Sequence, residues 1–249
     1  MKFLAGLFAV LCFVTPALAA PTFPALTGRV MDNANILSDT TEFDLNNKLA
    51  ALENKTSRQL VVVTIPSLQG YEISDYGYQL GRAWGIGQAK LNNGALLIIA
   101  PNEHKTRIEV GYGLEPILTD ALSEVILQSA VLPKFRAGDF DGGTEAGVDA
   151  LIQQLSLNTS EAEARAAAAE QQAGRGGNQG GGGFPAILIF LFIVFAIFRV
   201  FGGWGFLPLL FMGGGRGYGG GYGGGGWGGG GGFGGGGGGF GGGGASGSW

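Results

Sequence analysis

The residues with the clearest chemical potential lie between positions 107 and 121, RIEVGYGLEPILTDA. An alternating run from Arg107 to Val110 is typical of a strand, and it ends at Gly111-Tyr112-Gly113. Glu115 and Asp120 follow on a predicted loop before an apolar helical pattern. Because Ca²⁺ and Mg²⁺ take oxygen ligands, two carboxylates at a constrained strand end are consistent with a cation site. A structural alternative stays open, in which Asp120 caps the helix, Glu115 is a surface charge and the glycines form turns.

Nucleophilic catalysis has little support in this sequence. The chain has one histidine, His104, which falls in the predicted turn 102–105, where an imidazole is usually solvated. Its one cysteine, Cys12, lies in an apolar leader, so the mature chain offers no Cys–His pair. Gly85-Ile86-Gly87 lacks the third glycine and the lysine–hydroxyl ending of a phosphate-binding loop, and it follows a predicted helix rather than a strand.

The first residues of the chain are typical of a secretory signal. Lys2 is followed by an apolar run and then by small residues, so we expect a signal peptide at residues 1–19 that is cleaved after Ala19. Cleavage removes Cys12, and the exported protein must then rely on an ordinary hydrophobic core instead of disulfides.

Charge and length bound the class of the exported part. Between Ala20 and Glu170 the sequence holds 19 Asp and Glu against 11 Lys and Arg. This acidic balance argues against a nucleic-acid partner, because the phosphate backbone rewards clustered positive charge. A patterned stretch of roughly 140 residues is long enough for one domain with its own core.

Hydrophobic periodicity predicts alternating helices and strands. We therefore expect an α/β fold: a small sandwich with a mixed central sheet flanked by helices. A first helix begins at Ser38 or Asp39, and the other predicted elements are helices at 74–84, 120–131 and 144–157 and strands at 59–65, 95–100 and 107–111. The first two strands enclose a helix, which predicts a parallel pair with a right-handed connection. The short link before the third strand predicts an antiparallel hairpin.

The composition changes after Leu157. Residues 158–183 are rich in alanine and glycine; part of this stretch could extend the last helix, but it shows no apolar stripe, so we expect a linker. Residues 184–201 are almost uninterruptedly apolar and long enough to cross a bilayer as one transmembrane helix. Residues 213–249 contain 27 glycines among 37 positions, and we expect this tail to be disordered.

These segments together predict a single-pass membrane protein. With a cleaved signal, the acidic domain lies outside the cytoplasm and the glycine-rich tail in the cytoplasm. Arg199 and Arg216 agree with the tendency of positive charge to stay inside. The oligomeric state is left open.

Several motifs occur in the order found in a known family. They are RVMDNANILS at 29–38, QLVVV at 59–63, AWGIG at 83–87 before Asn93-Gly94, and the stretch 107–121. Taken together they resemble the TPM-domain family over about residues 28–157. The apolar segment and the glycine-rich tail closing on GASGSW look like those of its membrane-anchored bacterial members.

The resemblance implies an α/β sandwich domain held on the periplasmic side of the bacterial inner membrane. Members of the family have been linked to maintenance or repair of membrane protein complexes, some to acid phosphatase activity and some to Ca²⁺ binding. The positions that match the family's acidic motifs are Asp32, Glu115 and Asp120, which are the implied ligands of a Ca²⁺ or Mg²⁺ ion. Asp75 and Asp139 are weaker candidates.

Three hypotheses of function remain open. The first is a tethered module without catalysis that binds a divalent cation and a membrane-protein partner. The second is a metal-dependent acid phosphatase, in which the metal polarises a phosphoryl oxygen and Asp32 or Asp120 acts as the base. In the third, the glycine-aromatic tail is the interacting part and the domain is its anchor.

Overall fold

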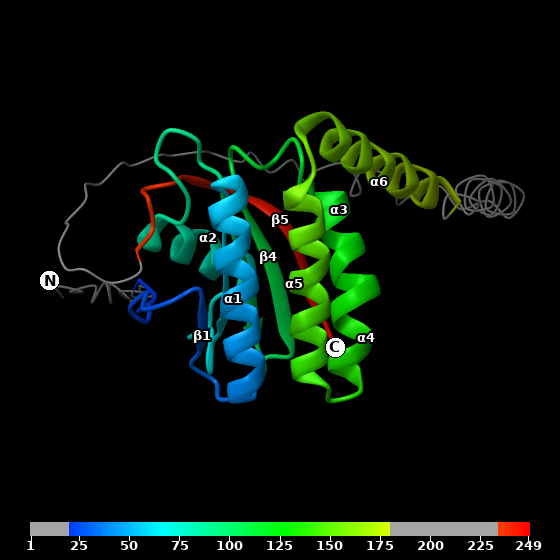
Figure 1. Cartoon of the computed structure of the whole chain (residues 1–249). Helices are drawn as coiled ribbons and strands as arrows, with labels where there is room; N and C mark the ends of the chain where they lie inside the picture. Colours follow the sequence, from blue (N-terminus) through cyan, green and yellow to red (C-terminus); the bar gives the residue numbers. More distant parts are fainter. Residues whose placement is uncertain (1–19, 180–233) are drawn as a thin grey trace, which may run out of the picture.

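A five-stranded mixed sheet with helices on both faces forms the centre of the protein (Figure 1). The computed structural model describes residues 20–179 and 234–249. The strands are β1 (Val30–Asp32), β2 (Gln59–Thr64), β3 (Gly94–Ala100), β4 (Lys105–Gly111) and β5 (Phe240–Ser248). The helices are α1 (Asp39–Thr56), α2 (Ile73–Trp84), α3 (Asp120–Ile126), the π-helical turn η1 (Leu127–Val131), α4 (Leu132–Arg136), α5 (Phe140–Ser156) and α6 (Thr159–Gln179).

The sheet order follows the chain, β1-β2-β3-β4-β5. β1, β2 and β3 run parallel, whereas β4 and β5 are antiparallel to their neighbours. The predicted α/β class, the parallel pair around a helix and the antiparallel hairpin are thereby confirmed. β1 is an addition, because a strand of three residues is too short to show a periodic pattern.

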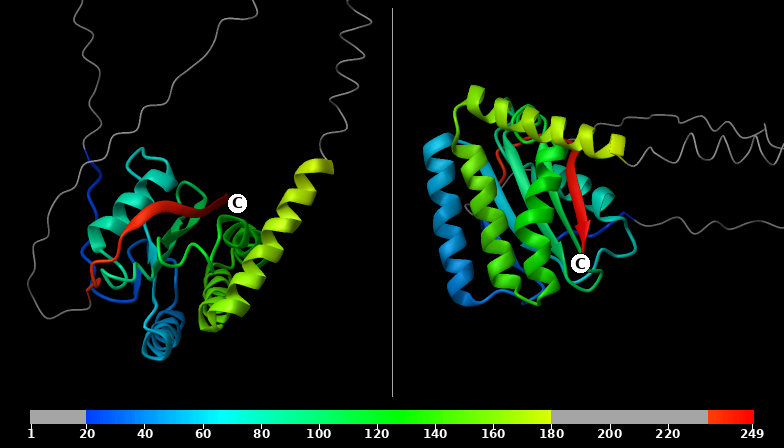
Figure 2. Two further views of the ribbon diagram at one scale, coloured as in Figure 1. Left: turned by 90° about the horizontal axis from the view of Figure 1, so that it is seen from above. Right: turned by 90° about the vertical axis from the view of Figure 1, so that its right-hand side faces the viewer.

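Alternation along the strands divides the core into two layers. Leu60 and Val62 face a cluster with α1, α3, α5 and α6, while Val61 and Val63 face a cluster with α2. Seen from above, α2 lies on one side of the sheet and α1 and α5 on the other (Figure 2). Both faces of β2 and β3 are covered, which is why these strands read as continuous apolar runs.

The predicted linker is wrong over residues 159–179, which form α6. Ala162, Ala166 and Ala169 are buried, and the helix packs against α3. The buried side chain of Gln154 also joins α5 to α6, because its amide donates to the carbonyl of Ala162 at 3.0 Å. A stripe of methyl groups four and three positions apart is enough to dock a helix at close range, although it is too weakly hydrophobic to stand out in the sequence.

The glycine-rich tail is the largest departure from expectation. Its residues 240–248 are ordered as β5, which pairs with β4 along the whole length of that strand. The prediction of a disordered tail is therefore wrong for this part. Backbone hydrogen bonds to an open strand edge supply the order that the side chains of glycine cannot.

Three predicted segments lie outside the described residues: the signal peptide 1–19, the apolar run 184–201 and the tail residues 213–233. Within residues 20–179 and 234–249, no helix is both long and apolar enough to cross a membrane.

Docking of α6 can be tested by placing a charge on its buried stripe. We expect Ala166→Asp to release the helix, because an aspartate there loses its hydration without gaining a partner. Amide hydrogen exchange over residues 159–170 should become at least about tenfold faster, which corresponds to roughly 1.4 kcal/mol. Ala167→Asp, on the exposed side one position further, is the matched control and should leave exchange unchanged. Equal effects of the two variants would contradict a docked α6.

Candidate functional site: the tail-binding site on β4

β4 would form the edge of the sheet if residues 234–249, here called the C-terminal segment, did not cover it. Lys105 pairs with Ser248 at one end and Gly111 with Phe240 at the other, with an irregularity between Val110 and Gly111. We call the domain surface in contact with this segment the tail-binding site. It runs from the loop after α2, along β4, to α4.

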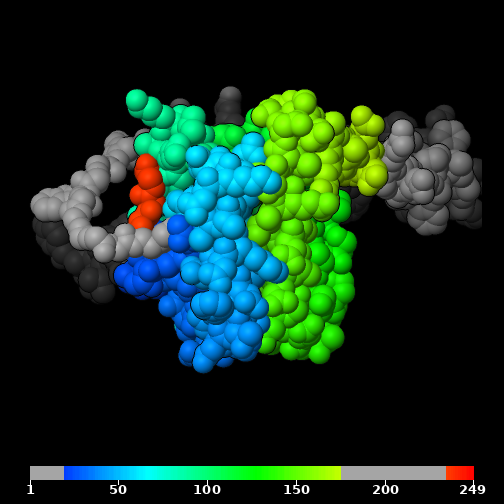
Figure 3. Space-filling view, in the orientation of Figure 1, coloured from blue at the N-terminus to red at the C-terminus, as the bar shows by residue number. Residues whose placement is uncertain are grey.

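The segment first crosses the loop between α2 and β3. The amides of Gly237 and Gly238 donate to the carbonyl of Gly85, and the amide of Gly239 donates to Oδ1 of Asn92 at 2.8 Å. In the space-filling view its first residues, in red, lie directly against this part of the domain (Figure 3). The backbones are so close that a Cβ atom on Gly238 would come within 2.2 Å of the carbonyl oxygen of Ile86. Glycine is required here by contact, not merely tolerated.

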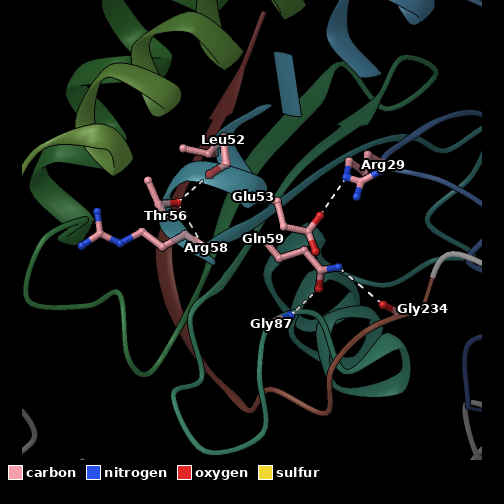
Figure 4. A network of polar contacts seen from close by, with 8 residues as sticks. All are labelled: Arg29, Leu52, Glu53, Thr56, Arg58, Gln59, Gly87 and Gly234. Atoms are coloured by element: carbon pink, nitrogen blue, oxygen red, sulfur yellow. Dashed lines mark hydrogen bonds and ion pairs between the residues drawn. The ribbon is translucent and has the colours of Figure 1, made fainter. Parts of the chain in front are cut away.

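A polar pocket of about 370 Å³ lies where the segment meets the domain. Gln59 bridges the two parts: its Oε1 accepts from the amide of Gly87 at 2.6 Å, and its Nε2 donates to the carbonyl of Gly234 at 3.4 Å (Figure 4). Glu53, which also lines the pocket, is paired with Arg29 at 2.8 Å. Two of the polar side chains that line this pocket, Gln59 and Glu53, are thus already engaged in contacts within the protein.

Phe240 anchors the segment at the α2 face. Its side chain is fully buried in the cluster formed with α2. A Cβ atom on Gly81 would lie 2.9 Å from the ring, so the absence of a side chain in the middle of α2 makes the space that the ring fills. Burial of a phenylalanine contributes about 2–3 kcal/mol, which offsets part of the cost of ordering the glycines.

Trp249 anchors the other end. Its ring packs edge-on against Phe135 with 4.8 Å between centroids, and it lies 5.7 Å from the ring of His104. The backbone amide of Trp249 donates to the carbonyl of His104 at 3.2 Å. The one histidine of the chain is therefore part of the tail-binding site, where it contacts an aromatic ring.

Between the anchors, a buried ion pair faces β5. Arg107 and Glu109 project from β4 toward α2, with Nε and Oε2 2.5 Å apart and side chains 5% and 0% exposed. The guanidinium also donates to Oγ of Ser246 and to the carbonyl of Gly242, both at 2.8 Å. The C-terminal segment thus supplies hydrogen bonds that a buried guanidinium needs.

The surroundings of the Glu109 carboxyl group change its pKa. Burial raises its pKa to about 7, although the charge and hydrogen bond of Arg107 act in the opposite direction. The negative charge of nearby Asp120 raises the pKa further. Its Oε1 atom has no hydrogen-bond partner among the residues that the structure describes.

Two of the three predicted metal ligands lie at the rim of the tail-binding site. Oδ1 of Asp120 accepts from the amide of Gly244 at 2.6 Å, and Oε1 of Glu115 would be 3.2 Å from a Cβ atom on Gly243. The helix cap that was the alternative role of Asp120 is provided by Thr119, whose side chain accepts from the amide of Leu122. Both carboxylates therefore face neighbouring residues of β5.

Asp32 lies elsewhere. It ends β1 at the opposite edge of the sheet, with β2, β3 and β4 between it and β5. Its carboxylate accepts from Oγ1 of Thr64 at 2.5 Å and from the amide of Leu37 at 2.8 Å. Its acidic neighbours are in α1, where burial, followed by the charges of Asp32 and Asp39, raises the pKa of Glu42. The structure does not bring Asp32 together with Glu115 and Asp120.

The weaker candidates have separate places. Asp75 is in the first turn of α2, and Asp139 caps α5 by accepting from the amide of Gly142 at 2.9 Å. Among residues 20–179 and 234–249, no group of three or more His, Cys, Asp or Glu side chains is arranged to hold a metal ion.

The sequence interpretation missed the ion pair and both aromatic anchors. The alternating run from Arg107 to Val110 indicated a strand, but nothing local showed that Arg107 and Glu109 would be buried beneath α2 and beside β5. Two signals were available: glycines 77 and 81, four positions apart inside a helical pattern, and two aromatic residues, Phe240 and Trp249, around a glycine stretch of strand length.

The raised pKa of the buried Glu109 carboxyl group predicts that docking of β5 depends on pH. A solvated Glu109 would return toward the ordinary carboxyl value of 4.5, so the docked state binds the proton more tightly. The equilibrium constant for docking of β5 is then largest below pH 4.5. It falls as the pH rises through about 7, by up to about tenfold per pH unit. Amide exchange of β4, corrected for intrinsic rates between pH 5 and 8, measures this.

Glu109→Gln, which cannot titrate, should flatten that dependence, and the amides of β2 should not show it at all. A steep pH dependence that persists in Glu109→Gln would contradict the assignment to this carboxyl group.

The domain is similar to a known protein family and to several solved structures. The model of the TPM domain family matches residues 30–154, which include β1 to β4 and most of α5 but not the C-terminal segment. The N-terminal domain of a protein from P. gingivalis is 37% identical, with 52% of this chain and 82% of that chain covered and a TM-score of 0.49.

Two further solution structures are similar at 19% identity. The N-terminal domain of the cg2496 protein from Corynebacterium glutamicum covers 58% of this chain and 89% of its own, with a TM-score of 0.43. The BA42 protein from Bizionia argentinensis covers 48% of this chain and 81% of its own, with a TM-score of 0.44. No curated protein matches the chain. Because the family model covers half of its length, the chain belongs to the TPM domain family.

Proposed function

We propose that the TPM domain of this chain is a strand-binding module, whose β4 edge holds the C-terminal segment and whose role is interaction and not catalysis. The observation that carries the proposal is the pair Arg107–Glu109, which is buried beneath α2 and whose guanidinium donates hydrogen bonds to β5. Buried charges are costly unless they are paired and their remaining hydrogen bonds are made. The β4 edge carries a buried guanidinium that needs further acceptors, and a strand paired with this edge can provide them.

Recognition of the segment is specific to its sequence. A Cβ atom on Gly244 would come within 1.9 Å of the carbonyl oxygen of Ile108, and one on Gly247 within 2.8 Å of a methyl carbon of Leu132. Side chains are accepted only at certain positions, where Phe240 and Ala245 are buried and Ser246 meets Arg107. Main-chain pairing with alternate side-chain selection is how proteins bind extended peptides at a sheet edge.

The bound strand is also the part of the domain most suited to open. Each ordered glycine costs about 0.5–1 kcal/mol more than an alanine, and β5 contains five of them. Strands with few buried side chains open locally at lower free energy than the core. In this proposal, a membrane-protein partner competes for the β4 edge in the complex-maintenance role that the family resemblance implies.

The anchor residue gives the direct test. We expect Phe240→Ala to loosen β5, because truncating a buried phenylalanine costs about 3–5 kcal/mol. Exchange of those amides of residues 105–111 that bond to β5 should accelerate at least about tenfold, equivalent to 1.4 kcal/mol or more, while the amides that bond to β3 stay protected. Phe43→Ala makes the same chemical change on the exposed side of α1 and is the matched control. If β4 exchanges equally slowly in both variants, β5 does not hold the edge in solution.

Cation binding is a second candidate, favoured by one observation. Burial raises the pKa of Glu42, and the nearby charges of Asp32 and Asp39 raise it further. These carboxylates are not arranged as a ready-made metal site, but a divalent cation bound near them would relieve their repulsion. Of the three predicted ligands, only Asp32 belongs to this location. Glu115 and Asp120 belong to the tail-binding site.

A Ca²⁺ titration separates the two ends of the sheet. We expect amide shifts around residues 32–42 that disappear in Asp32→Asn and persist in Asp120→Asn. Shifts abolished by Asp120→Asn instead would move the ion to the rim of the tail-binding site. No shift at millimolar Ca²⁺ would reject cation binding at either place.

A further inference from the structure

The pairing of β4 with β5 constrains the side of the membrane on which the C-terminal segment lies. β4 is an integral part of the TPM domain, with β3 on one side and β5 on the other. Register contacts run from Lys105–Ser248 to Gly111–Phe240, so the two strands touch along their full length. Whatever compartment contains the domain must therefore also contain residues 240–248.

The intervening chain makes this constraint informative. α6 ends at Gln179 and the described chain resumes at Gly234. Between these points the sequence contains the apolar run 184–201, which alone predicts one crossing of the membrane. A single crossing would separate β4 from β5 by a hydrocarbon layer of about 30 Å.

A second copy of the chain does not remove the conflict. Every copy inserted in the same orientation would carry its domain on one side and its C-terminal segment on the other. No β5 in that membrane, whether from the same chain or from a neighbour, could then reach a β4 edge. The choice is between a single crossing and a completed sheet.

The contacts of the segment favour the completed sheet. They include a fully buried Phe240, a Trp249 ring packed on Phe135, and a buried guanidinium that donates to Ser246 and Gly242. Close backbone contacts at Gly238 and Gly244 leave no space for other residue types. So many independent contacts between the segment and the domain are not expected if the two were held in different compartments.

We propose that the C-terminal strand lies on the same side of the membrane as the TPM domain and is donated by the same chain. This inference rests on the proposed strand-binding function. The apolar run 184–201 then does not carry the C-terminus across the bilayer, and the glycine-rich segment is available to extracytoplasmic partners. The expectation of a cytoplasmic tail is replaced by an extracytoplasmic one.

Cysteine labelling in cells that produce the full-length chain tests the side directly. Cleavage of the predicted signal peptide would leave no native cysteine, so single variants Gly174→Cys and Ser248→Cys report only their own positions. Both positions are exposed, one on α6 and the other on β5. A membrane-impermeant maleimide should label both in spheroplasts and neither in inverted vesicles. Labelling of the two variants from opposite sides would overturn the proposal.

A double variant, Lys105→Cys with Ser248→Cys, tests the pairing on which the proposal rests. These residues are register partners, and the Cα separation of paired antiparallel residues suits a disulfide. Mild oxidation should yield a crosslinked monomer on a non-reducing gel. A crosslinked dimer would overturn donation by the same chain. Same-side labelling without any crosslink would overturn the strand-binding function and leave the topology standing.

Discussion

The far edge of the sheet depends on one buried interaction, the ion pair between Arg107 and Glu109. A guanidinium buried beneath a helix is stable only if its charge is paired and its hydrogen-bonding groups are met. α2 provides the cover and, through Gly77, the room, because a Cβ atom there would lie 3.2 Å from the Arg107 side chain. β5 provides acceptors for the guanidinium. The charged pair, the glycine in α2 and the C-terminal strand are therefore parts of one arrangement.

The parts of the fold that follow from local pattern could be predicted. The runs that form β2 and β3 are buried on both faces, and continuous burial leaves an unbroken apolar sequence. α1 can be predicted from its cap at Ser38 and from the leucines on one of its sides. β5 gives no such signal, since five of its nine residues have no side chain and therefore no periodicity. Its order comes from a partner strand far away in the sequence.

The candidate site was predictable only in fragments. Glu115 and Asp120 were expected together on a constrained loop, and they do meet adjacent residues of β5. Whether Asp32 lies near them depends on the order of the strands, which local sequence patterns do not show. In the structure, β1 lies at the other edge of the sheet. The burial of Arg107 and Glu109 was not predicted for a related reason: alternation identifies the two faces of a strand but does not say which elements will cover each face or pair with its edge.

The separation along the chain between β4 and β5 has a consequence for how the protein folds. Arg107 and Ser246 hydrogen-bond across 139 positions, whereas β2 connects to β3 through α2 alone and β3 to β4 through a short turn. Contacts between distant positions form slowly, because the chain must first lose the entropy of closing a long loop. The four-stranded core should therefore assemble early with its charged edge still hydrated, and closure by β5 should be a separate, later phase of folding.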